Sequence, residues 1–196
     1  MQELNLAPGL LLSMPQLSDP NFTRAVVLML DHGDDGSFGL IMNQPTPMSV
    51  PEILQNLEVD WCGDPDAVVW SGGPVMPTSG WILHSGSDDL GPASDTLDHA
   101  LEFSGNLKIS ENFFLSTSEE NIKILAESAP KSMRFLLGYA GWSEGQLAEE
   151  MAEGSWLHAD INNEILFNSP AEKMWEHCLK NIGIDPEAIV QSRGVH

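Results

Sequence analysis

The chain has 196 residues with 42% hydrophobic content, which suits one globular domain spanning residues 1–196, or at most two small lobes. Its 29 acidic and 8 basic residues give a formal net charge of −21, which argues against direct contact with nucleic acid or anionic lipid. The apolar run from Leu10 to Leu12 is too short for a signal peptide or a membrane span, so we expect a cytoplasmic protein without membrane contact.

Two strands joined by a hairpin begin the predicted fold. Residues 25–30 (AVVLML) are continuously apolar, which is typical of a buried strand, and residues 37–43 (SFGLIMN) form the next strand. The turn residues 31–36 (DHGDDG) separate them. Residues 44–48 (QPTPM) predict a break, and residues 50–57 (VPEILQNL) predict a short amphipathic helix with a proline in its first turn.

The middle of the chain predicts further short strands. They fall at residues 67–70 (AVVW), 80–85 (GWILHS), 107–110 (LKIS) and 113–116 (FFLS). A Gly-Gly-Pro turn lies between the first two strands, and residues 85–92, rich in Gly, Ser and Asp, predict a surface loop.

Helices and strands then alternate irregularly. The sequence Thr117-Ser118-Glu119-Glu120 predicts a capping box with Thr117 as N-cap, and Pro130 ends the helix that follows. Residues 133–141 predict a strand, and residues 144–154 predict a helix that ends at a glycine.

The C-terminal part predicts two short strands, at residues 155–160 (SWLHAD) and 164–167 (EILF). Ser169 begins a second capping box, whose helix runs to about residue 181, and Asp185 caps a last short helix. Strands that follow strands by hairpin, with helices inserted irregularly, predict an α+β fold with a mainly antiparallel sheet.

One motif suggests a hydrolase. The sequence Gly141-Trp142-Ser143-Glu144-Gly145 fits the G-x-S-x-G nucleophile elbow between a predicted strand and a predicted helix. Asp160 with His177 or His158 could complete a triad by chain order alone. The elbow belongs to regular parallel α/β sheets, which this sequence does not predict. Ser143 is therefore a weak catalytic candidate, and the alternative is a turn that places it near a helix N-cap.

Other candidate sites have simpler alternatives. The turn Gly72-Gly73-Pro74 lacks the Gly-Lys-Ser/Thr of a phosphate loop, so it is either a plain turn or a set of bare amides that binds an anion. The spacing of acids around His32 does not fit a calcium loop and is better explained as a solvated hairpin tip. His84 is either a hydrogen-bonded core histidine or a side chain that points into a pocket. We expect no metal and no cofactor.

The two cysteines are interpreted for the reducing compartment that a cytoplasmic protein occupies. Cys62 and Cys178 are the only cysteines, and they lack the spacing of a zinc site, so we expect free thiols. Cys178 joins Ser143 and His84 as a reactive candidate if the protein is an enzyme.

Four segments together resemble the AlgH-like (YqgE) family of small bacterial proteins. They are MPQLSDPNFTRAVVLMLDHGDDGSFGLIMNQP, WSGGPVMPTSGWILHS, RFLLGYAGWSEGQLAEEMAEGSWL and ILFNSPAEKMWEHCLKNIGI, which cover most of the chain from about Pro8 to Ile184. The resemblance implies a single α+β domain, whose strongly bent, bifurcated sheet forms a pseudo-barrel with helices packed outside. Members are sometimes labelled putative transcriptional regulators, but no DNA-binding motif is recognisable in this chain.

The resemblance also marks family-typical positions. They are Asp19, Pro20, Phe22, Arg24, His32, Gly39, Asn43, Pro45, Gly72, Gly73, Pro74, Gly80, His84, Gly138, Tyr139, Trp142, Gly145, Gln146, Leu147 and Trp156. Asp31 departs from the glutamate more usual in the family, and the family pattern does not require serine at position 143.

We therefore predict a regulatory protein that binds a small molecule or another protein without direct DNA contact. The predicted pocket gathers turns that we expect to be neighbours, and its residues are Asn43, Gly72, Gly73, Pro74, His84, Gly141 and Trp142. The alternatives are an unrecognised enzyme acting on a small molecule and a DNA-binding transcriptional regulator.

Overall fold

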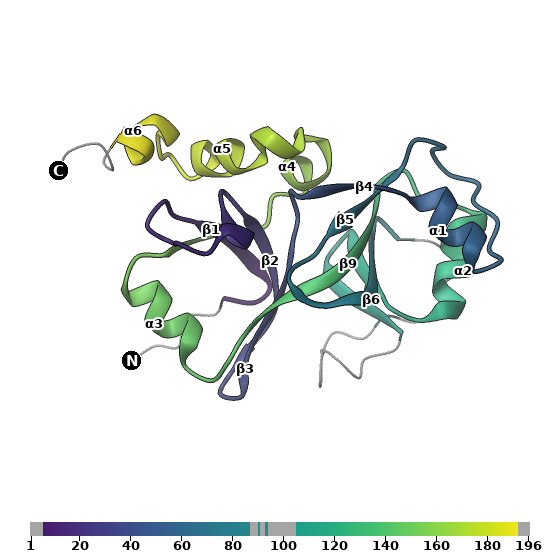
Figure 1. Ribbon diagram of the computed structural model, residues 1–196, viewed down its shortest axis with the longest axis horizontal. Coiled ribbons are helices and arrows are strands. Elements are labelled where there is room, and N and C mark those ends of the chain that lie inside the picture. The colour runs from purple at the N-terminus through teal and green to yellow at the C-terminus, as the bar shows by residue number, and fades with distance from the viewer. Residues whose placement is uncertain (1–5, 87–89, 91–92, 94–104, 192–196) are drawn as a thin grey trace. The chain divides into compact units, whose positions relative to one another are not determined.

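The computed structural model describes residues 6–86, 90, 93 and 105–191, and the chain divides into two compact units (Figure 1). Unit 1 comprises residues 1–44, 72–75 and 139–196, and unit 2 comprises residues 45–71 and 76–138. Strand β9 (Met133–Trp142) begins in unit 2 and ends in unit 1, so each unit contains part of one long strand.

Unit 1 is built on an antiparallel sheet with the strand order β10-β1-β2-β3-β9. Its other strands are β1 (Gly9–Ser13), β2 (Val26–Gly33), β3 (Gly36–Ile41) and β10 (Trp156–Ala159). Its helices are the 3-10 turn η1 (Pro20–Phe22), α3 (Gln146–Ala152), α4 (Asn163–Asn168), α5 (Ala171–Asn181) and α6 (Pro186–Gln191). Figure 1 shows α4, α5 and α6 following one another along one side of this unit.

The central strands of unit 1 are covered on both faces, which explains their continuous apolar runs. All five residues of β1 are buried. Leu11 packs inside the sheet in one cluster with Trp142 and Trp156. On the outside, α5 packs on β1, and the Trp175 Nε1 donates to the Ser13 carbonyl at 2.9 Å.

The sheet of unit 1 curls back on itself. Trp142 on β9 and Trp156 on β10 lie on the two end strands of the sheet order, yet their ring centroids are 5.7 Å apart. Phe22 packs against both rings, at 6.1 Å from the first and 5.4 Å from the second. This aromatic cluster fills the interior that the curled sheet encloses.

Glu150 of α3 joins the two tryptophans. Its Oε2 accepts the Trp142 Nε1 proton at 3.0 Å and the Trp156 Nε1 proton at 2.7 Å. Its Oε1 accepts from Gln146 Nε2 at 2.9 Å. A hydrogen bond to a charged acceptor is stronger than one between neutral groups, and a buried indole N–H needs a partner. The carboxylate therefore links β9 and β10, the first and last strands of the curled sheet of unit 1.

Unit 2 contains a second sheet with the strand order β9-β6-β8-β7, from which β5 branches by pairing in parallel with β9. The remaining strands are β4 (Pro45–Ser49), β5 (Val68–Ser71), β6 (Val75–His84), β7 (Asn106–Ser110) and β8 (Phe113–Ser116). The helices are α1 (Val50–Asn56) and α2 (Glu119–Glu127). Both pack into one core, where Leu54 and Leu125 meet Val69 and Ile82.

These observations confirm the α+β class, the mainly antiparallel pairing and the bifurcated sheet. The hairpin of β2 and β3 is confirmed, with a tighter turn than predicted, because only Asp34 and Asp35 lie outside the strand pairing. Within residues 6–86 and 105–191, no helix has the length and the apolar character that a membrane crossing requires.

Two predicted elements are wrong. Residues 44–48 are predicted as a break, but Pro45–Ser49 form β4, whose pairing with β5 is irregular between Pro45 and Ser49. Prolines are tolerated there because β5 is the only partner of β4 among the described strands, which leaves β4 an edge strand. Residues 164–167, predicted as a strand, belong to α4, because the Asn162 side chain accepts the Ile165 amide and caps a helix.

Two predicted caps are also displaced. Ser118, not Thr117, caps α2 by accepting the Asn121 amide at 3.1 Å, while Thr117 accepts the Gly105 amide at 3.3 Å. Ser169 does not cap α5, whose N-cap is Pro170. Most of the surface loop predicted at residues 85–92 lies outside the described residues.

The Glu150 contacts predict that replacing this carboxylate by an amide lowers the stability of the fold. Glu150→Gln leaves one oxygen and removes the charge, so at least one donor among Trp142, Trp156 and Gln146 loses its acceptor. We expect the free energy of unfolding in urea to fall by about 1–3 kcal/mol, with altered near-UV circular dichroism from the tryptophans. The matched control is Glu149→Gln, an exposed neighbour on the same helix, which should change stability by less than about 0.5 kcal/mol. Equal effects of the two substitutions would contradict this role of Glu150.

Candidate ligand-binding site beside helix α5

The backbone at Arg24 is held in an uncommon conformation. Its φ is 50°, in the left-handed region that residues with a side chain seldom adopt. Asn43 fixes this bend, because its Nδ2 donates to the Arg24 carbonyl at 2.9 Å and its Oδ1 accepts from the Val26 amide at 2.9 Å. Strain of this kind costs about 1–3 kcal/mol and is concentrated at functional sites. Arg24 is therefore the starting point of the candidate site.

The Arg24 side chain lies between an aromatic ring and a carboxylate of α5. Its guanidinium carbon is 5.5 Å from the Trp175 ring centroid, within cation–π range. Its Nη1 is 3.9 Å from Glu176 Oε1, and Lys173 Nζ is 3.3 Å from Glu176 Oε2. Glu176 thus joins two cations through the two oxygens of one carboxylate.

These side chains line a cavity of about 380 Å³, here called the Arg24 pocket. Its lining residues are Arg24, Lys173, Trp175, Glu176, Lys180, Asp185, Pro186 and Glu187. Three of the eight basic residues of the whole chain are among them, against three of the 29 acidic residues. The pocket is therefore far richer in cations than the chain as a whole.

Sequence reasoning found only one of these cations. Arg24 was singled out as a family-typical position, but Lys173 and Lys180 were missed. A local signal existed, because Lys173, Glu176 and Lys180 are spaced by three and four residues and so share one helix face. The contact of that helix face with Arg24 joins parts of the chain that are distant in sequence, so it can be identified only from the folded structure.

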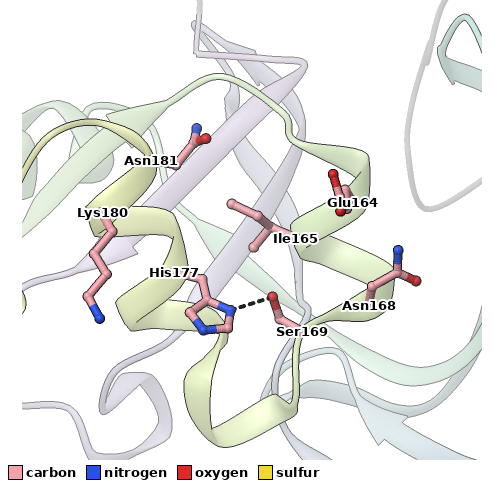
Figure 2. A pocket seen from close by; sticks show the side chains of 7 residues that line it. All are labelled: Glu164, Ile165, Asn168, Ser169, His177, Lys180 and Asn181. Atoms are coloured by element: carbon pink, nitrogen blue, oxygen red, sulfur yellow. Dashed lines mark hydrogen bonds between the residues drawn. The ribbon is translucent and has the colours of Figure 1, made fainter.

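A second cavity, of about 510 Å³, lies between α4 and α5 and is here called the α4–α5 pocket (Figure 2). Its lining residues are Glu164, Ile165, Asn168, Ser169, His177, Lys180 and Asn181. Figure 2 shows the Ser169 hydroxyl and the His177 ring pointing toward each other, with 2.8 Å between Oγ and Nδ1. Lys180 lines both pockets.

The predicted glycine turn is a close-packed backbone element of unit 1. Gly72 accepts the Ile41 amide at 2.7 Å. Gly73 has a φ of 150°, and a Cβ built on it would overlap the Tyr139 carbonyl group. Both glycines are buried, and Pro74 is exposed.

The other predicted pocket residues are divided between the units. Gly141 and Trp142 lie within β9 rather than in a turn, so that prediction is corrected. The atoms nearest to a Cβ built on Gly141 belong to the Tyr139 ring and to the Val75 side chain. Because Val75 directly follows the glycine turn, the turn and this part of β9 are neighbours. His84 belongs to unit 2. A ligand site shared by all these residues stays a prediction.

His84 is a fully buried member of a hydrogen-bond chain in unit 2. The Gly86 amide donates to Nδ1 at 3.1 Å, so the proton of the neutral ring is on Nε2. Nε2 then donates to Ser116 Oγ at 3.0 Å, and this hydroxyl donates to Asn106 Oδ1 at 3.0 Å. Burial lowers the pKa of His84 to about 4 and outweighs the opposing effect of Asn106.

The catalytic candidates lie in different settings. Ser143 is exposed, and its amide donates to Gln146 Oε1 at 3.1 Å, next to Gly145, the left-handed N-cap of α3. His177 pairs with Ser169 rather than Ser143. His158 has a buried Nε2 with no partner among the described residues. Burial raises the pKa of Cys178 to about 12, which makes its thiol a poor nucleophile near neutral pH.

The described residues contain no group of three or more His, Cys, Asp or Glu side chains placed to hold a metal. His32, at the acidic hairpin, instead forms a hydrogen bond of 2.8 Å between its Nδ1 and Ser37 Oγ. Cys62 and Cys178 are both free thiols.

Fold and site together define a class of small α+β proteins with a branched, mainly antiparallel sheet. A sequence profile described as AlgH-like matches residues 10–187, and the chain belongs to this family. A UPF0301 protein from Myxococcus xanthus is 38% identical over 98% of this chain and 99% of its own length. A second UPF0301 protein, from Magnetococcus marinus, is 33% identical over 98% and 97% of the two chains.

Two solved structures have a similar fold. The solution structure of the AlgH protein from Pseudomonas aeruginosa gives a TM-score of 0.70 at 28% identity, covering 94% of this chain and 93% of that one. A crystal structure of a Corynebacterium diphtheriae protein gives a TM-score of 0.66 at 19% identity, covering 92% and 89%. The second likeness bears on the fold alone.

The His84 environment predicts a pH dependence of stability. Its pKa is about 4 in the folded chain against 6.5 when unperturbed, so the unfolded state binds the extra proton between these values. The His84 contribution is complete above pH 6.5 and is lost as the pH falls to 4, by about 3 kcal/mol. Urea unfolding of wild type and His84→Gln across this range should show their difference shrinking toward low pH. Because both chains carry the same carboxylates, a constant difference would rule out His84 as the cause.

The glycine turn predicts a strong effect of one added methyl group. Gly73→Ala should lower the free energy of unfolding by about 3 kcal/mol or more, because the new Cβ collides with backbone rather than with a flexible side chain. Gly33→Ala is the matched control, since nothing lies within 4 Å of a Cβ built there. Thermal unfolding of the two variants measures the contrast, and similar melting temperatures would refute the close packing of Gly73.

Proposed function

We propose that the protein is a regulatory binding domain whose ligand site is the Arg24 pocket. The observation that carries this proposal is the strained Arg24 backbone, which Asn43 holds so that the guanidinium reaches α5. A strained residue that lines a cavity of about 380 Å³ is a typical arrangement for a small-molecule site. A protein segment that inserts one side chain would use the same contacts.

Charge supports a site that does not touch DNA. A DNA-binding face spreads many cations along the phosphate backbone, whereas this chain has 8 basic against 29 acidic residues. Three of the eight converge on one small pocket. Any regulatory role in transcription is therefore indirect, through a ligand or a partner protein.

We also propose that the chain acts as one domain in the cytoplasm. The family profile spans both units, from residue 10 to residue 187, and the two UPF0301 relatives align over nearly their whole lengths. Two free cysteines fit a reducing compartment.

A second candidate function, ester hydrolysis, is favoured by the α4–α5 pocket. Ser169 Oγ lies 2.8 Å from His177 Nδ1 at the wall of a cavity of about 510 Å³. The serine oxygen would attack the ester carbonyl as His177 takes its proton, and the alcohol would leave with that proton before water releases the acid. A fluorophosphonate probe tests this, because labelling that survives Ser143→Ala and disappears in Ser169→Ala would identify the nucleophile. An unlabelled wild-type protein would exclude it.

The binding function predicts ligand stabilisation that depends on Arg24. We expect at least one compound in a panel of neutral, cationic and anionic metabolites to raise the melting temperature of the wild type and not that of Arg24→Asn. Asparagine tolerates the left-handed backbone, so this variant removes the guanidinium and keeps the bend. Lys123→Gln is the control, because its side chain is 52% exposed, close to the 54% of Arg24, but it lies on α2 in unit 2. A panel with no Arg24-dependent compound would reject the proposed site.

A further inference from the structure

We infer that the ligand of the Arg24 pocket carries an oxyanion, a carboxylate or a phosphate, and that Glu176 occupies the binding cations until this ligand displaces it. This inference rests on the proposed function of the same pocket. It names the chemical class of the ligand and a competing group within the chain.

The first support is the local enrichment in cations: three basic residues line the pocket against three acidic ones, whereas the whole chain has 8 basic against 29 acidic residues. In 0.1 M salt, charges beyond about 10 Å are largely screened, so the pocket's own residues decide what binds there. Arg24, Lys173 and Lys180 supply three positive charges to this pocket in a chain with a net charge of −21. The three cations come from two segments that are distant in sequence, namely the turn before β2, which supplies Arg24, and α5, which supplies Lys173 and Lys180.

The second support is the geometry of the arginine. A guanidinium recognises a carboxylate or a phosphate through paired, parallel N–H donors. In Arg24 this group is placed over the Trp175 ring, 5.5 Å from its centroid, by a backbone bend that Asn43 maintains. The Trp175 ring is in turn anchored to the Ser13 carbonyl. The donor group is therefore positioned in advance, which lowers the cost of ordering it when a ligand arrives.

The third support is the behaviour of Glu176. Its carboxylate meets Lys173 at 3.3 Å and Arg24 at the longer distance of 3.9 Å. A pair at 3.9 Å between partly exposed side chains is weak, so an incoming oxyanion can replace it. Glu176 is thus an internal stand-in for the ligand, and its removal frees both cations.

The other acids at the rim are less available to the cations. Asp185 Oδ1 accepts the Glu187 amide at 3.0 Å, which commits this carboxylate to the start of α6. Glu187 lies in the first turn of that helix. Glu176 is therefore the acid whose removal should change anion binding most.

Isothermal titration calorimetry at low ionic strength tests the inference with four probes: inorganic phosphate, pyrophosphate, citrate and choline. We expect saturable binding of at least one of the three anions to the wild type and none of choline. Glu176→Gln should tighten the anion about five- to tenfold, because one competing charge is removed. Arg24→Asn and Lys180→Gln should each weaken it about tenfold or more, while Lys123→Gln should leave it unchanged. Comparing the phosphates with citrate tells which oxyanion the pocket prefers.

The controls separate binding in the pocket from general charge effects. Far-UV circular dichroism and melting temperature establish that each variant is folded before titration. Anion binding that weakens equally in Arg24→Asn and Lys123→Gln would be nonspecific and would overturn the inference. Failure of all three anions to bind wild type and Glu176→Gln would overturn it as well.

The two proposals fail in distinguishable ways. If neutral or cationic compounds stabilise the wild type in an Arg24-dependent manner while the anions do not bind, the oxyanion inference is wrong and the binding function stands. If no compound of any charge depends on Arg24, both are wrong. Anion binding that Glu176→Gln fails to tighten would overturn the role of Glu176 alone.

Discussion

One carboxylate oxygen that accepts two indole N–H groups organises unit 1. Glu150 accepts hydrogen bonds from Trp142 of β9 and Trp156 of β10, the first and last strands of the unit 1 sheet, and so links the two sides of its curl. Phe22 packs on both rings and belongs to η1, only two residues before Arg24. The position of the candidate site therefore depends on a contact made inside the curled sheet. A half-buried acceptor with several donors is sensitive to loss, since each buried donor left without a partner costs free energy.

The net charge of the chain and the charges inside the Arg24 pocket have different effects on binding. A net charge of −21 sets the long-range repulsion of nucleic acid and lipid, but screening confines each charge to its neighbourhood. Local recognition is decided by the few side chains that meet in one cavity. This is why an acidic protein can carry a site for anions, provided that the fold collects cations from separate segments. Three lining residues of the Arg24 pocket meet this condition.

Much of the fold was predictable because its signals are local. The apolar run of β2 and the hairpin turn were read from neighbouring residues, and so was the proline in the first turn of α1. The errors arose where pairing or capping overrode local pattern, as in β4 with its prolines and in α4, where Asn162 supplies the cap. The candidate site was harder to predict from the sequence than the fold. Asn43 and Arg24 were marked by resemblance, but their contact and the approach of α5 bring together residues distant in sequence. No pattern of spacing reports a guanidinium over the ring of Trp175.

The path of the chain through the two units has a consequence for synthesis on the ribosome. Unit 1 consists of three separate segments and unit 2 of two, so neither is a continuous stretch of sequence. The apolar strands β1 and β2 emerge early, but β10 and the covering helix α5 are made only near the end. Until then the nascent chain exposes strand edges and apolar faces of the kind that aggregate or recruit chaperones. The faces of β1 therefore stay uncovered until β10 and α5, which follow much later in the sequence, have been synthesised.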